Sequence, residues 1–595
     1  MTSSQGNKRL INSVQNCVDE NLDGFVRINN GIRRVIGHRI MVREDYQDVI
    51  TEGKVSIVSG GGSGHEPQTT GAVGKGMLTA CIMGSIFTSP PSQEILLAIR
   101  LVAKHNSAGC LLIIANYTGD RLNFGVAMEK ARQEGIRVGS VTVGEDCALV
   151  SQDKSAGRRG LVGVSVTYKL AGALSEEGRS LEEMIPLLNN FINNMGSMGL
   201  SLTACTIPGS GATFNVADDE VELGLGVHGE AGIKTLKLKT AKESVKIVID
   251  HMTNPENRSH VKLSKRDRIA CFINNLGGTT NMEMNIISGE VINYLEDTVG
   301  AIVERAYSGS FITSLEMCGF IVTLLRVDDT IIRLLDARTD APIWPQHLLS
   351  SVKKEDRRPI NIELENVEFE TTDTESTVFK TPDDSYLMYD IINNICKSLI
   401  SSEARLNLLD TEGGDGDCGS TLSKGAQVLL TILGSKDNPG LPVHCPYLLS
   451  LAVANIAENH MGGSSGALYS LMLTSGAYCV KDIISPTSWH QALQTATNTI
   501  KRYGGAEVGD RTMLDPLYAA SEVIKERLGK DSIVSVLKRA TEAAELAAHQ
   551  TAKMKARAGR ASYVSADRLK EADPGAVGVA LWMRAISDTI EKYYS

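Results

Sequence analysis

Up to about residue 340, short apolar runs alternate with stretches of helical character. Each run is apolar nearly throughout and ends in a loop that carries glycine or aspartate, which is typical of strands in an α/β fold whose ligand site lies at the strand ends. The expected strands are Val55–Ser59, Cys110–Ala115, Ile136–Val143, Ala204–Pro208, Cys271–Asn274 and Phe320–Leu325. We therefore predict an α/β domain of two packed lobes over residues 1–345.

The pattern changes after about Pro345. Residues 346–383 are polar and strongly acidic with few core-forming side chains, and we interpret them as an exposed linker. From Tyr386 onward, helical periodicity and abundant alanine predict an all-α domain over residues 384–595. The expected helices are Ser420–Leu433, Leu448–Asn459, Ser465–Val480, Trp489–Arg502, Pro516–Leu528, Ile533–Ala556 and Gly575–Lys592.

Composition limits the possible functions. The 595 residues exceed what a single core supports, and a hydrophobic content of 42% is ordinary for a soluble globular protein. A formal net charge of −10, without a basic stripe, argues against a nucleic-acid partner. The start of the chain has no apolar segment of signal-peptide type, no apolar run is long enough to cross a membrane, and the eleven cysteines are scattered without a CxxC pair. These features predict reduced thiols, no membrane partner and a cytoplasmic location.

The segment LDTEGGDGDCGST places three carboxylates, Asp410, Asp415 and Asp417, within eight residues and spaces them with glycines. A hard divalent cation needs several oxygen ligands on a backbone flexible enough to wrap it. Magnesium held in this way keeps positions open for phosphates, so the segment suggests phosphoryl transfer from a nucleotide. The alternative is a polar surface turn, since glycine and aspartate are the commonest turn residues.

Two loops after predicted strands carry candidate chemistry. The glycine run Gly60–Pro67 allows the backbone to approach a small ligand closely, and it includes His65, which is either a general acid or base or a structural loop histidine. The run lacks the Gly-Lys-Ser/Thr ending of a P-loop. Asp120, in NYTGD, follows the next strong strand and falls where α/β sheets bind ligands, with a helix cap as the alternative.

The segment GLGVHGE formally matches G-x-G-x-x-G, but the sequence before it is a poor buried strand and the sequence after it does not open a clean helix. We therefore put the weight on His228, which is close to Glu230 along the chain. A neutral imidazole can attack a carbonyl carbon, although a structural histidine remains the alternative.

In the helical half, three Gly- or Pro-bearing turns precede helices: MGGSSG, GDRTM and DPGA. Such turns direct free N–H groups and the positive end of a helix dipole toward an anion. Each turn is a weak signal by itself. Together with the Asp cluster, they predict a nucleotide site built from loops at helix ends.

Taken in order, GGGSGHEP, NYTGDRLNF, GLGVHGE, NLGGTTN, YSGSFITSLEM, GGDGDCGST and DPGA resemble the ATP-dependent, single-chain dihydroxyacetone kinases, including their animal triokinase relatives. The resemblance covers nearly the whole chain. It implies an α/β substrate domain, a linker and a nucleotide domain that is an antiparallel barrel of about eight helices.

The resemblance also implies a mechanism. In the family, the histidine of GxGxHGE, here His228, binds the ketone as a covalent hemiaminal, while His65 and Asp120 assist addition at the carbonyl and deprotonation of the attacking hydroxyl. The implied catalytic residues are thus His228, His65 and Asp120. The implied substrate-binding residues are Gly62, Ser63, Gly64, His65, Ala115 and Asp120.

In the helical domain the resemblance implies that Asp410, Asp415 and Asp417 hold two Mg²⁺ ions against the phosphates of ATP. The implied nucleotide-binding residues are Asp417, Cys418, Gly419, Ser420, Ser464, Ser465, Gly504, Thr512, Met513, Pro574, Gly575 and Ala576. The implied substrate is dihydroxyacetone or glyceraldehyde, within glycerol metabolism, and the implied assembly is a homodimer.

Two other functions fit the same sequence. The animal relatives also split FAD to a cyclic riboflavin phosphate with a divalent metal such as Mn²⁺, which would use the helical domain alone. A non-catalytic triose-binding regulatory protein is a different class of function, and the intact DGD cluster disfavours it.

The sequence departs from the family at three positions. The family usually has lysine just before NYTGD, where this chain has Ala115. Loss of a charge-assisted hydrogen bond is worth roughly 1.5–3 kcal/mol, so substrate binding or substrate choice is expected to differ. Tyr168 stands where the family has histidine, and Arg338 where it has proline; these two changes look peripheral.

Overall fold

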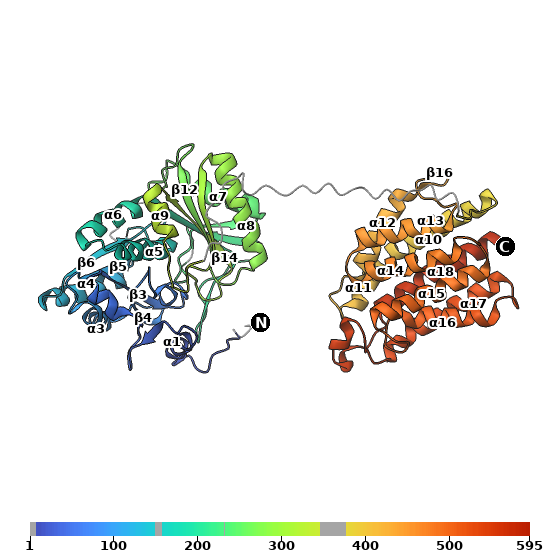
Figure 1. The fold of residues 1–595 in the computed structure, drawn as a ribbon, viewed down its shortest axis with the longest axis horizontal. Coiled ribbons are helices and arrows are strands. Elements are labelled where there is room, and N and C mark those ends of the chain that lie inside the picture. Colours follow the sequence, from blue (N-terminus) through green and yellow to red (C-terminus); the bar gives the residue numbers. More distant parts are fainter. Residues whose placement is uncertain (1–7, 149–156, 231, 346–375) are drawn as a thin grey trace. The chain divides into compact units, whose positions relative to one another are not determined.

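The computed structural model describes residues 8–148, 157–230, 232–345 and 376–595. The chain divides into two compact units, with the break between Asn361 and Ile362. That break falls inside the segment predicted to be a linker, of which residues 346–375 lie outside the described residues. Each unit is considered separately below (Figure 1). No helix in the described ranges is both long and apolar enough to cross a membrane.

The first unit contains a six-stranded sheet with the order β1-β2-β4-β3-β5-β6. Its central and far strands, β4, β3, β5 and β6, run parallel, while β1 and β2 are antiparallel additions at one edge. The strands are β1 Ile32–Arg34, β2 Ile40–Arg43, β3 Ser56–Ser63, β4 Ala80–Ile86, β5 Cys110–Ala115 and β6 Val138–Val143. The parallel core agrees with the α/β prediction, because β3 and β5 end side by side and deliver their loops to one edge.

A second six-stranded sheet has the order β11-β10-β7-β14-β12-β13. Here β12 and β13 run parallel, whereas the other neighbouring pairs are antiparallel. The strands are β7 Met195–Ser201, β10 Glu220–Leu223, β11 Lys234–Lys237, β12 Arg268–Asn275, β13 Ile302–Gly309 and β14 Gly319–Arg326. The apolar runs in this half reflect burial of both sheet faces and not a parallel arrangement.

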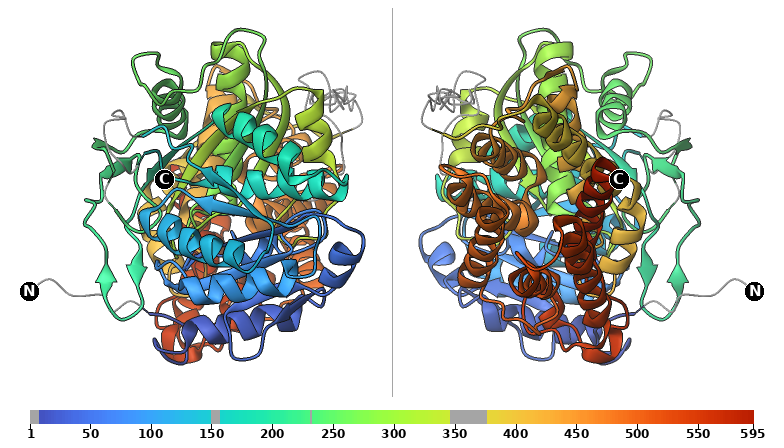
Figure 2. Two further views of the ribbon diagram at one scale, coloured as in Figure 1. Left: turned by 90° about the vertical axis from the view of Figure 1, so that its left-hand side faces the viewer. Right: turned by 90° about the vertical axis from the view of Figure 1, so that its right-hand side faces the viewer.

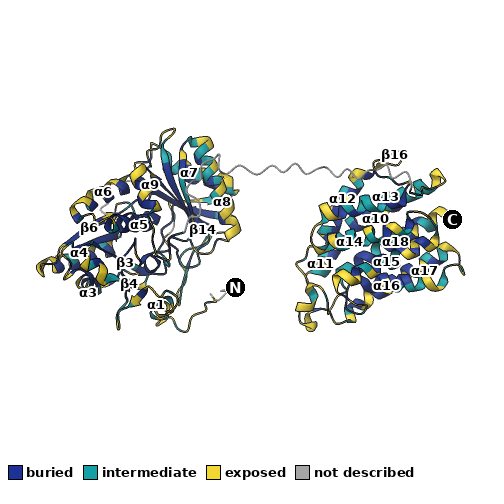
Figure 3. Cartoon of the chain, in the orientation of Figure 1, coloured by how far each residue is buried: buried dark blue, intermediate teal, exposed yellow. Residues whose placement is uncertain are grey.

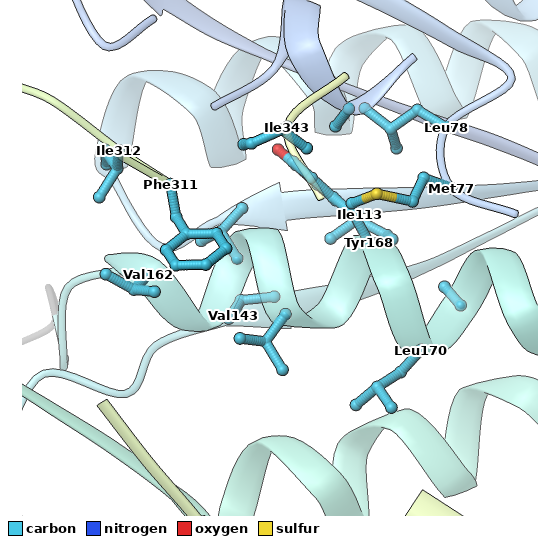
Figure 4. Packing of buried hydrophobic residues seen from close by; sticks show 14 of the residues in the cluster. Met77, Leu78, Ile113, Val143, Val162, Tyr168, Leu170, Phe311, Ile312 and Ile343 are labelled. Atoms are coloured by element: carbon cyan, nitrogen blue, oxygen red, sulfur yellow. The ribbon is translucent and has the colours of Figure 1, made fainter. Parts of the chain in front are cut away.

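Helix α5 (Val162–Glu176) lies between the two sheets and packs against strands of both. Its residues from Val162 to Ser175 are all buried, which is expected of a helix that is hydrophobic all round. Figure 4 shows side chains of α5, including Tyr168 and Leu170, against Ile113 of β5 and Val143 of β6. The same core cluster includes Phe272 and Ile321 of the second sheet, so one core joins the two lobes.

Helices cover the outer faces of both sheets. The first sheet packs against α3 (Ser92–Ala103) and α4 (Thr118–Gln133), and the second against α7 (Ala241–Thr253) and α8 (Asn281–Asn293). The order of layers is therefore helix, sheet, helix, sheet, helix. Figure 3 shows the strands buried and the outward faces of the covering helices exposed. The remaining elements are α1 Cys17–Ile28, α2 Tyr46–Thr51, α6 Leu181–Asn193, β8 Thr206–Ile207, β9 Gly211–Ala212 and α9 Asp329–Asp336.

Two local predictions need correction. The glycine run was expected to follow its strand, but β3 continues to Ser63, because glycines there let β3 pass closely beside β4. A Cβ on Gly60 would lie 2.4 Å from the carbonyl oxygen of Ile82. The sequence before His228 was judged a poor buried strand, yet Glu220–Leu223 forms β10, paired between β7 and β11. Its glutamates hid the pattern, although Glu222 is buried and accepts hydrogen bonds from Gly232 and Thr235.

The second unit is helical, apart from a short hairpin of β15 (Gly434–Ser435) and β16 (Asn438–Pro439). The α-helices over residues 376–595 are α10 Pro382–Ser401, α11 Glu403–Asp410, α12 Cys418–Leu433, α13 Pro446–Ile456, α14 Gly463–Ala477, α15 Pro486–Gly504, α16 Leu514–Arg527, α17 Ile533–Gln550 and α18 Pro574–Tyr594. Figure 2 shows these orange and red segments as helices packed side by side. The predicted helices are present, but α17 ends six residues earlier than Ala556 (550 against 556).

Eight of these helices close into a ring, as expected for a barrel. Going round, α10 packs on α12, α12 on α13, and so on to α18, which packs back on α10; the short α11 lies against α12 and α18. Because consecutive helices of such a ring alternate in direction, α12, α14, α16 and α18 all begin at one end of the barrel. The turns predicted to bind a nucleotide therefore gather at that end.

A buried carboxyl group ties the layers of the first unit together. Oε1 of Glu145, directly after β6, accepts hydrogen bonds from the backbone N–H groups of Leu161 and Gly163 at the start of α5, at 2.9 and 2.8 Å. It also accepts one from the hydroxyl of Ser197 on β7, at 3.0 Å. Oε2 is buried without a hydrogen-bond partner among the described residues, and burial raises the pKa of Glu145 to about 7.

We predict that Glu145 makes the stability of the first unit depend on pH. Because its pKa rises from 4.5 to about 7 on folding, the folded state binds the proton more tightly, and stability is lost as the pH rises through that window. The free energy of unfolding should fall by up to about 3 kcal/mol between pH 4.5 and 7, and Glu145→Gln should abolish that fall. Denaturant titrations at pH 5 and pH 8 measure it, with Glu129→Gln, an exposed change on α4, as control. An unchanged pH dependence in Glu145→Gln would refute the assignment.

Candidate functional site

In the first unit, four segments converge at the carboxyl ends of β3 and β5: the glycine run, the start of α4, the loop that carries His228, and residues 311–315 between β13 and β14. The structure brings His65 and His228 together, with ring centroids 4.8 Å apart and the rings nearly perpendicular. Two histidines separated by more than 160 positions in sequence (65 and 228) thus form one site.

His65 is held as a neutral base. Its Nδ1 lies 2.8 Å from the carbonyl oxygen of Thr313, and a carbonyl only accepts, so the proton is on Nδ1. Nε2 then carries a lone pair and is buried with no hydrogen-bond partner in the described structure. Burial, reinforced by His228, lowers the pKa of His65 from 6.5 to about 3, so the ring stays neutral at working pH. Phe87 stacks on it at 4.9 Å.

His228 is enclosed by aromatic rings and one carboxylate. Besides His65, the rings of Tyr117 and Phe87 meet it edge to face, with centroids 4.6 and 5.6 Å away. Nδ1 of His228 lies 3.6 Å from Oε1 of Glu230, and the backbone N–H of His228 donates to Oε2 at 3.0 Å. A carboxylate beside Nδ1 favours the tautomer with the proton on that nitrogen, which leaves the Nε2 lone pair available.

Two glycines of the run, Gly62 and Gly64, are required by close contacts with Phe87. A Cβ on Gly62 would lie 2.9 Å from the backbone of Phe87, and one on Gly64 would lie 2.8 Å from its ring. Gly64 also has φ +96°, in the region that favours glycine. The hydroxyl of Ser63 donates to the carbonyl oxygen of Gly84 at 2.8 Å, so this predicted substrate-binding side chain is engaged in the fold.

Ala115 lies at the end of β5, and Asp120 lies in the helix that follows, α4. Asp120 is only 7% exposed in the first turn of α4, and its Oδ1 accepts a hydrogen bond from Ser89 at 2.6 Å. Burial raises the pKa of this carboxyl group, while the nearby His228 lowers it. Ala115 is the last residue of β5 and is half-buried. Asp120 thus joins the two histidines, as predicted.

Sequence reasoning missed several residues of this site. The segment Phe311–Leu315 holds both histidine loops: Thr313 accepts from His65, and the hydroxyl of Ser314 donates to the carbonyl oxygen of Val227 at 2.8 Å. Leu315 N–H donates to Gly64 at 2.9 Å. The motif YSGSFITSLEM was noticed, but its polar residues bind backbone atoms far away in sequence, which no local pattern announces.

In the second unit the three aspartates come together as predicted. Carboxylate oxygens of Asp410, Asp415 and Asp417 lie within 4.8 Å of one another, between α11 and the start of α12. Asp410 also accepts the backbone N–H groups of Asp417 and Cys418, at 3.0 and 3.2 Å, which fixes the loop. Three carboxylates at this spacing are a donor set that suits a hard cation such as Mg²⁺.

The electrostatics of the cluster fit a cation. Burial and the charge of Asp415 raise the pKa of Asp417, which is the signature of like charges held together. Arg560 forms an ion pair with Asp415, and its hydrogen bond lowers the pKa of that carboxyl group. Burial raises the pKa of the thiol of Cys418, the first residue of α12, to about 12.

The remaining predicted nucleotide residues lie at the same end of the barrel. They comprise Asp417, Cys418, Gly419 and Ser420 at α12, Ser464 and Ser465 at α14, Gly504 at the end of α15, Thr512 and Met513 before α16, and Pro574, Gly575 and Ala576 at α18. A Cβ on Gly575 would lie 3.8 Å from Cβ of Met513, so two of these turns touch. Four helix N-termini at one end make an environment that favours anions.

A buried arginine, missed by sequence reasoning, holds these turns. Arg511 is 2% exposed and donates from Nη2 to the carbonyl oxygen of Glu571 at 2.9 Å, while Nη1 lies 3.8 Å from Asp573. Asp573 caps α18 by accepting from Ala576, and burial raises its pKa to about 6. The GDRTM and DPGA turns are thus joined by one side chain.

Comparison with known proteins agrees with this division. Residues 23–343 match the Dak1 domain and residues 412–588 match the DAK2 domain. The triokinase/FMN cyclase of Homo sapiens is 43% identical over 586 residues, which cover 98% of this chain and 99% of the relative.

Solved structures match as well. The dihydroxyacetone kinase from C. freundii in complex with AMP-PNP and Mg²⁺ has a TM-score of 0.65 at 29% identity and covers 98% of this chain and 99% of its own. The dihydroxyacetone kinase operon co-activator Dha-DhaQ, at 31% identity and a TM-score of 0.51, covers 55% of this chain and 98% of its own.

Fold and matches together define a protein that pairs a Dak1 α/β domain with a DAK2 helical domain. The chain belongs to the dihydroxyacetone kinase family.

Proposed function

We propose that this protein phosphorylates dihydroxyacetone, and also glyceraldehyde, with ATP as the phosphoryl donor. The observation that carries the proposal is the pair His65 and His228: two imidazoles 4.8 Å apart, one kept neutral with an unpartnered Nε2. Such a pair suits capture of a small carbonyl compound. The names of the human relative and of the C. freundii structure support the same activity.

The first unit supplies the carbonyl chemistry. Nε2 of His228 attacks the carbonyl carbon; as the N–C bond forms, the electron pair of the C=O bond moves to oxygen, which takes up a proton from the carboxyl group of Asp120. The proton on Nδ1 leaves toward Glu230, so the hemiaminal is neutral. His65 and Asp120 are the two groups suited to assist, since His65 offers a lone pair and Asp120 a carboxyl group with a raised pKa.

The second unit supplies the nucleotide chemistry. Asp410, Asp415 and Asp417 would hold Mg²⁺, as two ions, and the metal would neutralise the charge of the ATP phosphates. The N-termini of α12, α14, α16 and α18 face the same region and add positive potential. We also propose a homodimer in the cytoplasm, acting in glycerol metabolism; all eleven cysteines are free, which fits a reducing compartment.

A second activity is favoured by the relative's name, triokinase/FMN cyclase. Splitting of FAD to a cyclic riboflavin phosphate would use the helical unit alone, with Mn²⁺ on the same three aspartates. The two activities separate cleanly: a change at His228 should affect only the kinase, and a change at Asp417 should affect both. A purely regulatory triose-binding role is disfavoured by the assembled aspartates, which carbonyl binding does not need.

Replacing His228 with Ala should abolish phosphorylation of dihydroxyacetone, because it removes the Nε2 atom that forms the bond to the carbonyl carbon. A coupled ADP-release assay with dihydroxyacetone, glyceraldehyde and glycerol measures this, and wild type should use the two carbonyl compounds and not glycerol. His105→Ala, an exposed change, serves as control. Crystals soaked with dihydroxyacetone should show continuous density to His228; if wild type turns over the triose but that density is absent at good occupancy, the covalent step is wrong.

Asp417→Asn should remove most of the Mg²⁺-dependent binding of ATP, because it deletes a charge at the centre of the carboxylate cluster. Isothermal titration calorimetry with the full chain, with and without Mg²⁺, measures this. Asp588→Asn is the matched control, since that exposed aspartate lies near the far end of α18. Binding by Asp417→Asn that equals wild type would sink the assignment of the nucleotide site.

Ala115→Lys should lower the KM for dihydroxyacetone by about tenfold, the scale of one charge-assisted hydrogen bond. The kcat should change less, because the new contact would hold substrate and transition state alike. Ala115 is half-buried at the end of β5, so a long side chain can reach solvent without disturbing the core. Ala212→Lys, on exposed β9, is the control. An unchanged or higher KM would mean that the pocket is built around alanine, and larger hydroxy-ketones should then be tested.

A further inference from the structure

Behind the His228 loop lies a partly buried arginine to which the proposed kinase mechanism gives no role. The side chain of Arg159 is 16% exposed. Its Nε donates to Oδ2 of the buried Asp146 at 2.6 Å, and its Nη2 donates to the carbonyl oxygen of Gly224 at 2.8 Å. Gly224 directly follows β10, which ends at Leu223, and begins the loop to His228. Arg159 therefore anchors the base of this loop to the first lobe.

The third side of the guanidinium faces Glu230. A Cβ placed on Gly226 would lie 1.9 Å from Oε2 of Glu230 and 2.7 Å from Nη1 of Arg159, so both groups lie against the same glycine. Although burial raises the pKa of Glu230, the hydrogen bond and charge of His228 and the charge of Arg159 together lower it to about 2. Glu230 is thus a carboxylate held between a partly buried cation and the imidazole.

The charged groups of Asp146, Arg159 and Glu230 thus follow one another toward the imidazole of His228. Glu230 binds the backbone N–H of His228 through one oxygen and approaches Nδ1 through the other. The hydroxyl of Tyr117, whose ring contacts His228, is buried on the same side, where Arg159 is the nearest cation that acts on it. The Glu230 side chain is 46% exposed, so besides the backbone N–H of His228 the charge of Arg159 is what favours its carboxylate beside the imidazole.

We propose that Arg159 is a positioning residue of the carbonyl site: it holds Glu230 and the base of the loop, and through Glu230 it keeps the His228 proton on Nδ1 and the Nε2 lone pair toward the substrate. The inference rests on the proposed hemiaminal at His228. It concerns the capture of the carbonyl compound and not the nucleotide site, which lies in the other unit.

The test is a double-mutant cycle in the full-length protein. Arg159→Met and Glu230→Gln should each lower kcat/KM for dihydroxyacetone by roughly tenfold or more, while the KM for ATP stays within about twofold. Because the two side chains act as one unit, the double variant should lose little more than either single variant. Arg159→Lys should recover part of the loss, since an ammonium keeps a positive charge near Glu230 but cannot make the hydrogen bonds to both Asp146 and Gly224 in the same geometry.

The neighbouring arginine is the matched control. Arg158 donates to the carbonyl oxygens of Asp146, Glu145 and Met195 and to Sγ of Cys147, so it joins the same segments mainly through backbone atoms and does not approach Glu230 in any described contact. Arg158→Met should therefore lower stability without changing kcat/KM by more than about threefold. An Arg159→Met protein that matches Arg158→Met in both properties would overturn the positioning role, and so would losses that simply add in the double variant.

Failure of the inference differs from failure of the proposed function. If His228→Ala is inactive but Arg159→Met is as active as wild type, only the role of Arg159 is wrong. If His228→Ala keeps wild-type activity, the hemiaminal is wrong, and the role given to Arg159 is wrong with it.

Discussion

The carbonyl site depends on one crossing segment, Phe311–Leu315, between β13 and β14. The carbonyl oxygen of Thr313 in this segment accepts a hydrogen bond from Nδ1–H of His65. The hydroxyl of Ser314 donates to the carbonyl oxygen of Val227, in the loop that leads to His228. Asn274 fixes the segment in turn, since its side chain accepts from Phe311 N–H at 2.7 Å and donates to the carbonyl oxygen of Ile312 at 2.8 Å. The 4.8 Å separation of the two imidazoles is thus set by hydrogen bonds between lobes, which explains why the site needs both sheets.

The same constraint explains the unusual burial of polar groups between the sheets. A helix enclosed on both sides, as α5 is, cannot satisfy its first N–H groups with water, and Glu145 takes that role while bonding Ser197 on β7. Arg158 and Arg159 extend the connection to the backbone of both lobes. The loop that carries His228 therefore begins at a point where charged groups, and not apolar contacts alone, join the two halves.

Much of this arrangement could be predicted from the sequence, and the failures have physical causes. The strand Cys110–Ala115 was placed at its observed bounds, because an apolar run bounded by Asx and Gly residues has few other solutions. The aspartate cluster was found because all three carboxylates lie in one short segment, Asp410–Asp417. By contrast, Phe87, Tyr117 and Arg159 join the site from separate elements, and a ring or a guanidinium has no local signature of the partner that it meets. The glutamates of β10 likewise concealed a paired strand.

The two sites differ in a way that their chemistry requires. In the first unit, burial keeps His65 neutral and raises the pKa of Asp120, so lone pairs and protons are available without net charge at the carbonyl carbon. In the second unit, three carboxylates are forced together, and their repulsion is reduced by Arg560 at Asp415. Phosphate groups would bring still more negative charge to that end of the barrel. A divalent cation can stabilise carboxylates and phosphates at once. At the first site, the same cation would bind the imidazole nitrogens that the proposed carbonyl chemistry needs. Separate units let each environment exist without weakening the other.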